Sequence, residues 1–267
     1  MKISACIITY NQETYIKECL EGVLKQKLNC TYEIVIGEDC STDNTLRICK
    51  IYAEKYPDLI RILPSSKNLG MIGNWMRTIS DCKGKYIAFC EGDDYWTDPL
   101  KLQKQVDFME ENLNYSMCFH KVDVTFAHEG DFYEYDKPAN DILSIKDIMR
   151  KHYIATCSLV FRNGYFKKGL PSWFAQSISG DLPLEILLAS KGLTKYLDDT
   201  MACYRRNPGG ITQSVRQIAK IRSGYIFMYS KLAQEIKFPH SFYLHYIVLR
   251  LRVGYLKVYY NKIKSIF

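Results

Sequence analysis

The sequence predicts an α/β fold with a mostly parallel central sheet flanked by helices. Short apolar runs rich in β-branched residues alternate with segments whose apolar residues recur at helical spacing. Strands that alternate with helices imply βαβ units, parallel pairing and right-handed crossovers. With 267 residues, 47% of them hydrophobic, the chain can bury one α/β core and carry a smaller appendage.

The expected elements follow this alternation along the chain. Up to residue 100, strands are expected over 3–9, 32–37, 60–63 and 86–90, and helices over 13–25, 41–56 and 74–81. Further along, strands are expected over 117–126, 154–161 and 193–204, and helices over 101–111, 144–151, 181–190 and from 218 onward. Polar residues at 41–44 supply candidate helix caps, and Pro57 ends that helix.

The cysteines and the apolar segments indicate a cytoplasmic protein. The ten cysteines show no Cys-x-x-Cys spacing and no paired framework, and several lie inside apolar runs. We therefore expect reduced core residues. The apolar N-terminal run is too short for a signal peptide, and no stretch reaches about 18 uncharged apolar residues, so no spanning helix is expected.

The net charge of +7 is concentrated near the C-terminus. Residues 237–267 hold six of the 36 Lys and Arg and no acid, so the preceding residues carry 30 basic and 29 acidic side chains. A nearly neutral main body argues against a general nucleic-acid-binding surface.

An acidic cluster, Glu91, Asp93 and Asp94, follows the expected strand 86–90 directly. Carboxylates this close raise one another's pKa values unless a cation offsets their charge, and Mg²⁺ or Mn²⁺ with oxygen ligands is the usual solution. The alternative is a solvated acidic turn. Ligands of such sheets bind at the carboxyl ends of the strands, which also places residues 9–11 and 38–39 on this edge.

Five short motifs occur in order over the first hundred residues: Ile7-Ile8-Thr9-Tyr10-Asn11, Glu38-Asp39-Cys40-Ser41-Thr42-Asp43, Asn68-Leu69-Gly70, Gly84-Lys85-Tyr86-Ile87-Ala88-Phe89 and Glu91-Gly92-Asp93-Asp94. Together they resemble the nucleotide-binding half of the family 2 inverting glycosyltransferases, which have the Rossmann-like GT-A fold. The second half is similar through residues 180–183 and 204–210. The resemblance implies a GT-A domain over 1–217, with a nucleotide-sugar-binding half (1–100) and an acceptor-binding half (101–217), followed by a helical tail (218–267).

The resemblance also implies a donor pocket. In it, Asp39 would accept from a base N–H, and Asp93 and Asp94 would fill the Asp-x-Asp role, one on the ribose and the other on Mn²⁺ or Mg²⁺. Which of the two does which stays open, as does the role of Glu91. The residues implied in substrate binding are Thr9, Tyr10, Asn11, Glu38, Asp39, Asn68, Gly70, Asp93 and Arg205.

Asp181 matches the family's base position, where a carboxylate deprotonates the acceptor hydroxyl. Its alternative role is a helix N-cap, and Glu185, one turn later on the same face, is the second candidate base. Arg205 would pair with the diphosphate. Asn207 stands where the family often has a metal-binding His, and its role stays open.

The function implied is a metal-dependent glycosyltransferase that moves a sugar from a nucleotide-diphosphate donor, UDP-linked, to a hydroxyl with inversion. The acceptor would be a saccharide or a lipid-linked saccharide in cell-surface polysaccharide or glycolipid synthesis. The alternatives are a nucleotidyltransferase that acts on sugar phosphates and a non-catalytic partner protein with the same fold. The expected Gly-rich loop of a nucleotidyltransferase is missing after residue 9.

The tail carries one apolar stripe and one basic stripe. The apolar stripe is spaced as a helical face, and basic residues recur every seven positions on another face. Such a helix suits the surface of an anionic membrane, which would place the protein at the inner face of the cell membrane. The alternative is a helix packed on the body or in a homo-oligomer. The apolar stripe comprises Leu249, Val253, Leu256, Tyr260, Ile263 and Phe267.

Overall fold

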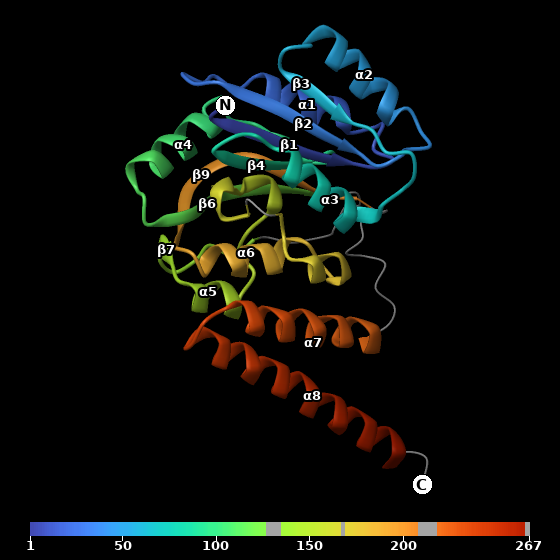
Figure 1. Cartoon of the computed structure of the whole chain (residues 1–267), viewed down its shortest axis with the longest axis vertical. Helices are drawn as coiled ribbons and strands as arrows, with labels where there is room; N and C mark the ends of the chain where they lie inside the picture. The colour runs from blue at the N-terminus through green and yellow to red at the C-terminus, as the bar shows by residue number, and fades with distance from the viewer. Residues whose placement is uncertain (127–134, 167–168, 208–217, 265–267) are drawn as a thin grey trace.

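The computed structural model describes residues 1–126, 135–166, 169–207 and 218–264 (Figure 1). Within these residues nine strands form one sheet in the order β3-β2-β1-β4-β8-β6-β9-β5, and β7 pairs with β9. The strands are β1 (Ile3–Thr9), β2 (Tyr32–Glu38), β3 (Ile60–Leu63), β4 (Tyr86–Glu91), β5 (Tyr95–Trp96), β6 (Tyr115–Phe126), β7 (Ile142–Leu143), β8 (Val160–Arg162) and β9 (Leu193–Arg206).

The predicted parallel sheet is confirmed. β1 pairs in parallel with β2 and β4, β2 with β3, and β6 with β9. β8 runs antiparallel to both β4 and β6 and joins the two parallel halves. The expected strand over 154–161 is wrong in its first half, because Thr156–Ser158 form a 3₁₀ turn, η1. The Ser158 hydroxyl and N–H both donate to the Ala155 carbonyl, which holds that turn.

The helices form one layer on each face of the sheet. Residues of α1 (Ile16–Leu24), α2 (Thr45–Lys55) and α4 (Lys101–Glu111) share one buried cluster with the sheet. The other cluster holds residues of α3 (Gly70–Asp81), α5 (Ile145–Arg150), α6 (Asp181–Ala189) and α7 (Ile218–Glu235). α8 (His240–Lys264) lies outside α7, farthest from the sheet (Figure 1).

α3 begins a turn earlier than the sequence predicts. Gly70 takes the positive φ of +76°, which favours glycine, and its N–H donates to Asn68 Oδ1 at 2.7 Å. Asn74 is therefore buried inside the helix, where its Nδ2 donates to the Gly37 carbonyl at 2.7 Å. The helix start predicted at residue 74 is therefore wrong.

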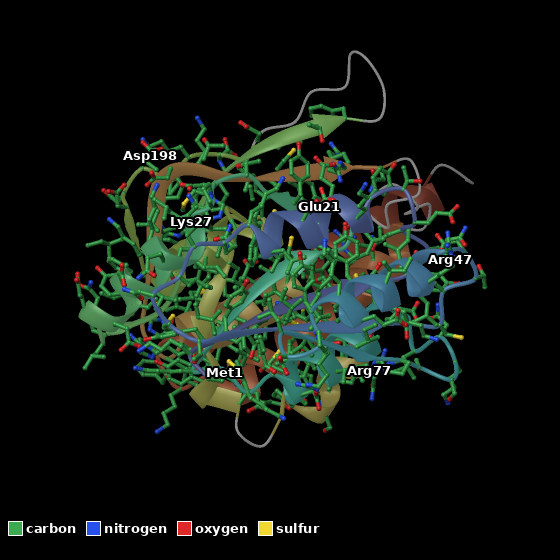
Figure 2. All side chains as sticks on the ribbon, turned by 90° about the horizontal axis from the view of Figure 1, so that it is seen from above. Met1, Glu21, Lys27, Arg47, Arg77 and Asp198 are labelled. Carbon is green, nitrogen blue, oxygen red and sulfur yellow. The ribbon has the colours of Figure 1, made fainter. Side chains whose placement is uncertain are left out.

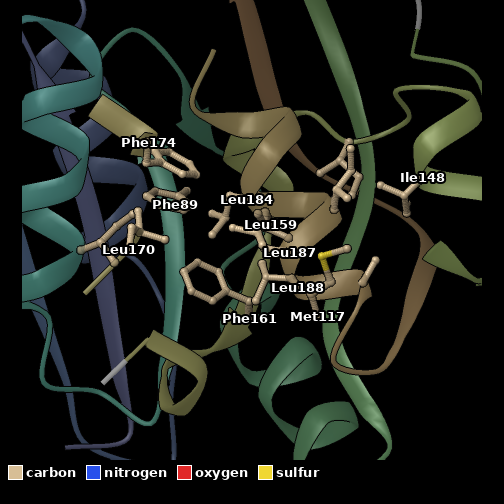
Figure 3. Packing of buried hydrophobic residues seen from close by; sticks show 14 of the residues in the cluster. Phe89, Met117, Ile148, Leu159, Phe161, Leu170, Phe174, Leu184, Leu187 and Leu188 are labelled. Atoms are coloured by element: carbon tan, nitrogen blue, oxygen red, sulfur yellow. The ribbon is translucent and has the colours of Figure 1, made fainter. Parts of the chain in front are cut away.

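An aromatic core fixes the end of β4 relative to α3 and α6. The Phe89 ring stacks on Trp75 at 4.7 Å and lies 5.7 Å from the Phe161 ring, and Leu184 and Leu187 belong to the same cluster (Figure 3). Such ring pairs contribute roughly 0.5–1.5 kcal/mol each beyond their buried area. The residues after Phe89 and the start of α6 are therefore positioned by the same close-packed cluster.

The two C-terminal helices differ in their contacts. α7 buries Met228, Leu232 and Ala233 in the core, and α8 turns Leu244 and Val248 inward. The expected domain boundary after residue 217 falls outside the described residues. No helix within the described part of the chain is long and apolar enough to cross a membrane.

One face of α8 exposes a row of apolar side chains. These are Phe242, Tyr246, Leu249 and Val253, at positions that share one side of a helix. Leu249 and Val253 were expected to lie on one stripe, and both are exposed. The side chains of the other expected members, from Leu256 to Phe267, lie outside the described residues.

All ten cysteines are free, and most are buried, as the sequence predicts. Cys6, Cys90 and Cys118 are fully buried in the two core clusters. They act there as small apolar side chains.

Candidate active site

β1, β2 and β4 end at one edge of the sheet, as the sequence predicts. Thr9 pairs with Glu38, and Ile8 pairs with Glu91, so the polar residues that follow these strands are neighbours. Arg47 and Arg77 lie on this side of the molecule in the view from above, and Met1, before β1, lies on the other (Figure 2).

The loop after β1 is tied to the loop after β2. Asn11 has a φ of +52°, which Asn tolerates better than most residues, and its Oδ1 accepts from the Thr42 N–H at 2.8 Å. The Thr9 hydroxyl donates to Gln12 Oε1 at 2.8 Å. Tyr10 is exposed at the mouth of this edge. These polar groups form one connected rim.

Glu38 and Asp39 are buried at the end of β2. Glu38 Oε1 accepts from the Ser41 N–H at 2.7 Å, and its Oε2 has no hydrogen-bond partner among the described residues. Asp39 Oδ1 accepts from the Leu69 N–H at 2.9 Å, which ties β2 to the segment where Asn68 and Gly70 start α3. The expected pocket residues of the first half therefore lie together.

The acidic turn after β4 packs tightly against the end of β1. The Gly92 N–H donates to the Ile8 carbonyl at 2.9 Å, and a Cβ on Gly92 would lie 2.4 Å from Gln12 Oε1 and 2.7 Å from Thr9 Oγ1. Only glycine allows this approach. The turn is therefore held against the rim.

The two aspartates of this turn have different partners. Asp94 is fully buried, and its Oδ1 accepts from the Arg205 N–H at 2.8 Å. Its Oδ2 makes no hydrogen bond among the described residues, although the Cys157 thiol is close enough to lower the pKa of Asp94. Asp93 Oδ2 accepts from Asn207 Nδ2 at 2.9 Å. Asn207, whose role the sequence leaves open, thus contacts the acidic turn.

The pKa values of the three acids are all raised. Burial is the main cause for Asp93 and Asp94, and the charge of Asp93 adds to the rise in the pKa of Asp94. Burial raises the pKa of Glu91 as well, with further contributions from Asp94, Asp93 and Asp181. Asp181, the first residue of α6, is thus among the charges that raise the pKa of Glu91.

Arg205 is held by several groups at once. Its Nη1 donates to the Asp93 carbonyl at 2.9 Å, its Nη2 pairs with Glu18, and its guanidinium lies 4.4 Å from the centre of the Tyr95 ring. Cation–π contact and ion pairing fix the side chain beside the acidic turn. Glu18 and Tyr95 were not predicted from the sequence.

Asp93 and Asp94 are suited to a hard divalent cation. Among the described residues no three His, Cys, Asp or Glu side chains are arranged to hold a metal ion by themselves. However, Mg²⁺-type sites commonly use one or two carboxylates and complete the shell with substrate phosphates and water. The unpartnered Asp94 Oδ2 beside Asp93 fits such a site.

Asp181 is the first residue of α6, and Gly180 occupies the cap position. The interpretation of Asp181 as the N-cap is therefore wrong, although its Oδ1 accepts from the Leu182 N–H at 2.8 Å. His152 Nε2 lies 3.7 Å from Asp181 Oδ2 and 3.1 Å from Glu185 Oε1. No local spacing indicates the role of His152, because its partners lie about thirty residues further along the chain.

Arg77 is a second residue that the sequence left unassigned. Arg77 Nη2 donates to the Glu38 carbonyl at 2.6 Å and its Nε donates to Asn74 Oδ1 at 2.9 Å. Backbone acceptors leave no side-chain pattern in a sequence, so this contact could not be predicted.

Comparison with known proteins gives a consistent result. Residues 4–170 match the family described as glycosyl transferase family 2. Uncharacterized protein Rv1520 of Mycobacterium tuberculosis is 37% identical over 213 residues, which cover 79% of this chain and 61% of that protein. The chain thus spans 61% of the length of this relative. The putative teichuronic acid biosynthesis glycosyltransferase TuaG of Bacillus subtilis is 27% identical over 82% of this chain and 84% of its own.

The fold also matches a solved structure. S. aureus TarS, residues 1–349, in complex with UDP-GlcNAc superposes with a TM-score of 0.72 over 95% of this chain and 73% of that chain, at 18% identity. The GT-A architecture implied by the sequence motifs is therefore confirmed.

Proposed function

Because the chain belongs to glycosyl transferase family 2, we propose that it transfers a sugar from a UDP-linked donor to a hydroxyl acceptor with inversion. One observation carries the proposal. Asp94 is fully buried with an unpartnered oxygen, beside Asp93 and on the same sheet edge as Asp39. A buried carboxylate oxygen without a partner is costly unless a ligand or cation completes it.

The nucleoside would lie along the ends of β1 and β2. Asp39 would accept from a base N–H, and Thr9, Tyr10, Asn11 and Glu38 would line the base and ribose. Asn68 and Gly70 would close this end. TarS, which has the same fold, binds UDP-GlcNAc. A carboxylate such as Asp39 would accept a hydrogen bond from the ring N–H of uracil, which favours a UDP-linked donor.

Asp93 and Asp94 would hold Mn²⁺ or Mg²⁺, with one of the two also on the ribose. The cation would supply Lewis-acid stabilisation of the charge on the leaving diphosphate. Arg205, fixed beside Asp93, would add positive charge near the phosphates. The ion pair between Arg205 and Glu18 offsets part of this positive charge.

Asp181 would act as the general base. It would take the proton of the acceptor hydroxyl while the oxygen forms a bond to the anomeric carbon. The bond from that carbon to the donor oxygen breaks, and its electron pair leaves on the nucleoside diphosphate. Because attack and departure occur on opposite faces of the sugar, the product is inverted. The effect of Asp181 on the pKa of Glu91 supports its place near the acidic turn.

The acceptor would be a saccharide or a lipid-linked saccharide of a cell-surface polymer or glycolipid. The name of TuaG, a teichuronic acid biosynthesis protein, supports this class. The exposed apolar row on α8, with Arg250 and Arg252 beside it, would contact an anionic membrane at its cytoplasmic face. A homo-oligomer built through this row is the alternative.

The test is a donor screen with the whole chain. UDP-, GDP- and dTDP-sugars are offered with and without Mn²⁺ or Mg²⁺, and release of nucleoside diphosphate is followed. We expect metal-dependent turnover of a UDP-sugar, its loss in Asp94→Asn and its retention in the exposed control Asp107→Asn. If no donor binds or is turned over, the proposal is wrong.

A further inference from the structure

His152 lies between two carboxylates of α6. Its Nε2 is 3.1 Å from Glu185 Oε1 and 3.7 Å from Asp181 Oδ2. The two acids are four residues apart, so they share one face of the helix, where like charges repel. The segment after α5 therefore places one imidazole at the meeting point of both acids.

We propose that His152 is a positioning residue for the transfer reaction: as a cation it neutralises Glu185 and holds the carboxylate of Asp181 toward the acceptor. This inference rests on the proposed function, because it takes Asp181 as the base. It concerns a side chain that does not itself touch the reacting atoms.

Exposure separates the roles of the two acids. The Glu185 side chain is 1% exposed, and its Oε2 has no hydrogen-bond partner among the described residues. The Asp181 and His152 side chains are 33% and 34% exposed. Only Asp181 can therefore reach an acceptor hydroxyl, and Glu185 serves as the buried counter-charge of His152.

The charge states agree with this geometry. Glu185 raises the pKa of His152 to about 9, with a smaller contribution from Asp181, so the imidazole is charged at neutral pH. Burial raises the pKa of Glu185, and His152 opposes that rise. One cation thus balances one acid and leaves the other carboxylate free to accept a proton.

An aromatic ring also lies near the imidazole. The Tyr135 ring lies 6.3 Å from the imidazole, edge-on, and 5.5 Å from the Tyr204 ring. Tyr204 precedes Arg205, so these rings connect the His152 cluster to the acidic turn. The titratable groups that face His152 are therefore Glu185, Asp181 and Tyr135.

The experiment compares His152→Gln, Glu185→Gln and the double variant with the wild type, using His245→Gln on α8 as a matched control. A misplaced catalytic group costs on the order of 10²-fold in rate. We expect His152→Gln to lower kcat by roughly that factor, with the donor KM unchanged, and the same loss to persist in the Glu185→Gln background. His245→Gln should keep wild-type kcat.

The pH profile provides a readout that a purely structural role would not move. His152 is charged below its pKa of about 9 and loses its proton above it. Wild-type kcat should therefore fall as pH rises through about 9, and this fall should be missing in His152→Gln.

Two outcomes overturn the inference. One is a His152→Gln variant with wild-type kcat and pH profile. The other is a double variant with the same kcat as Glu185→Gln, which would mean that His152 only satisfies Glu185. The double variant also covers the case in which His152→Gln fails to fold. A wild type that turns over no donor would instead reject the proposed function.

Discussion

The backbone N–H of Arg205 donates to Oδ1 of Asp94 at 2.8 Å, so the end of β9 closes over the acidic turn after β4. Just after β9, the side-chain amide of Asn207 makes a second contact with this turn, because its Nδ2 donates to Asp93 Oδ2 at 2.9 Å. Oδ1 of Asp94 is satisfied by this contact, and Oδ2 has no hydrogen-bond partner among the described residues.

Asp94→Asn should fold normally and lose metal-dependent turnover. The Asn carbonyl can still accept from the Arg205 N–H, but the cation loses a charged ligand. We expect turnover to fall by roughly 10²–10³-fold, measured as nucleoside diphosphate release over a Mn²⁺ titration. Asp107→Asn, an exposed change on α4, is the control. Wild-type metal dependence in Asp94→Asn would contradict the assignment.

Asp181→Asn should remove catalysis and keep donor binding. An amide cannot accept the acceptor proton, so kcat should fall by roughly 10²–10⁴-fold. Calorimetry with the nucleoside diphosphate should give an unchanged Kd, because the donor pocket lies on other elements. A loss of folding would show that Asp181 is needed for the first turn of α6 instead.

Asp39→Asn should weaken donor binding more than it slows the reaction. The amide oxygen can keep the contact with the Leu69 N–H, but the charged acceptor for a base N–H is lost. We expect the Kd for UDP to rise about tenfold, because the loss of one such hydrogen bond weakens binding by roughly that factor. Asp58→Asn, on an exposed loop, should leave this Kd unchanged.

Lys101 should make the stability of the protein depend on pH. It is fully buried, its Nζ donates to Gln105 Oε1 at 2.8 Å and lies 4.1 Å from the Trp96 ring, and burial lowers its pKa from 10.5 to about 8. Between about pH 8 and pH 10.5 Lys101 is protonated in the unfolded chain and largely neutral in the folded protein. The free energy of unfolding therefore rises with pH over this range.

Lys101→Met removes the pH-dependent contribution of this lysine to the free energy of unfolding. Relative to the variant, the wild type should gain about 2 kcal/mol between pH 7 and pH 10. Urea unfolding of both proteins at the two pH values measures it, and the comparison cancels the contribution of the cysteines. If both proteins show the same pH dependence, the pKa of Lys101 is not lowered in the folded protein.

Leu249→Glu should release the protein from anionic vesicles. Leu249 is 58% exposed in the apolar row of α8, so a carboxylate there opposes both insertion and the lipid charge. Cosedimentation with phosphatidylglycerol vesicles measures the bound fraction. Leu113→Glu, at a 74% exposed leucine after α4, is the control. If the wild type does not sediment but dimerises through this row, the homo-oligomer alternative holds.

Much of the fold could be predicted because its strands are strongly apolar. β1, β2 and β4 are buried on both faces and read as continuous apolar runs bounded by polar residues. β5 and β7 have two residues each, which is too short for any periodicity. The strand expected over 154–161 is longer than β8 because apolar residues, Ile154 and Ala155, also precede η1.

The site could be predicted in part for a similar reason. Parallel strands bring their carboxyl ends together, so Thr9, Glu38 and Glu91 were expected to be neighbours, and they are. The pairs Arg205–Glu18 and His152–Glu185 join distant segments through side chains alone. No local spacing indicates such pairs, because they depend on how the second half of the chain packs on the first.

The contacts that close the acidic turn join residues more than a hundred positions apart in the sequence. Contacts of this kind pay the loop-closure entropy of the intervening chain, so they form late in folding. During synthesis, β1, β2 and β4 emerge well before β9. The hydrogen bond from the Arg205 N–H to Asp94 can form only after β9 has emerged. We therefore expect a nascent chain to gain donor affinity only after residue 207 has left the ribosome, which would make nucleotide binding a marker of completed folding.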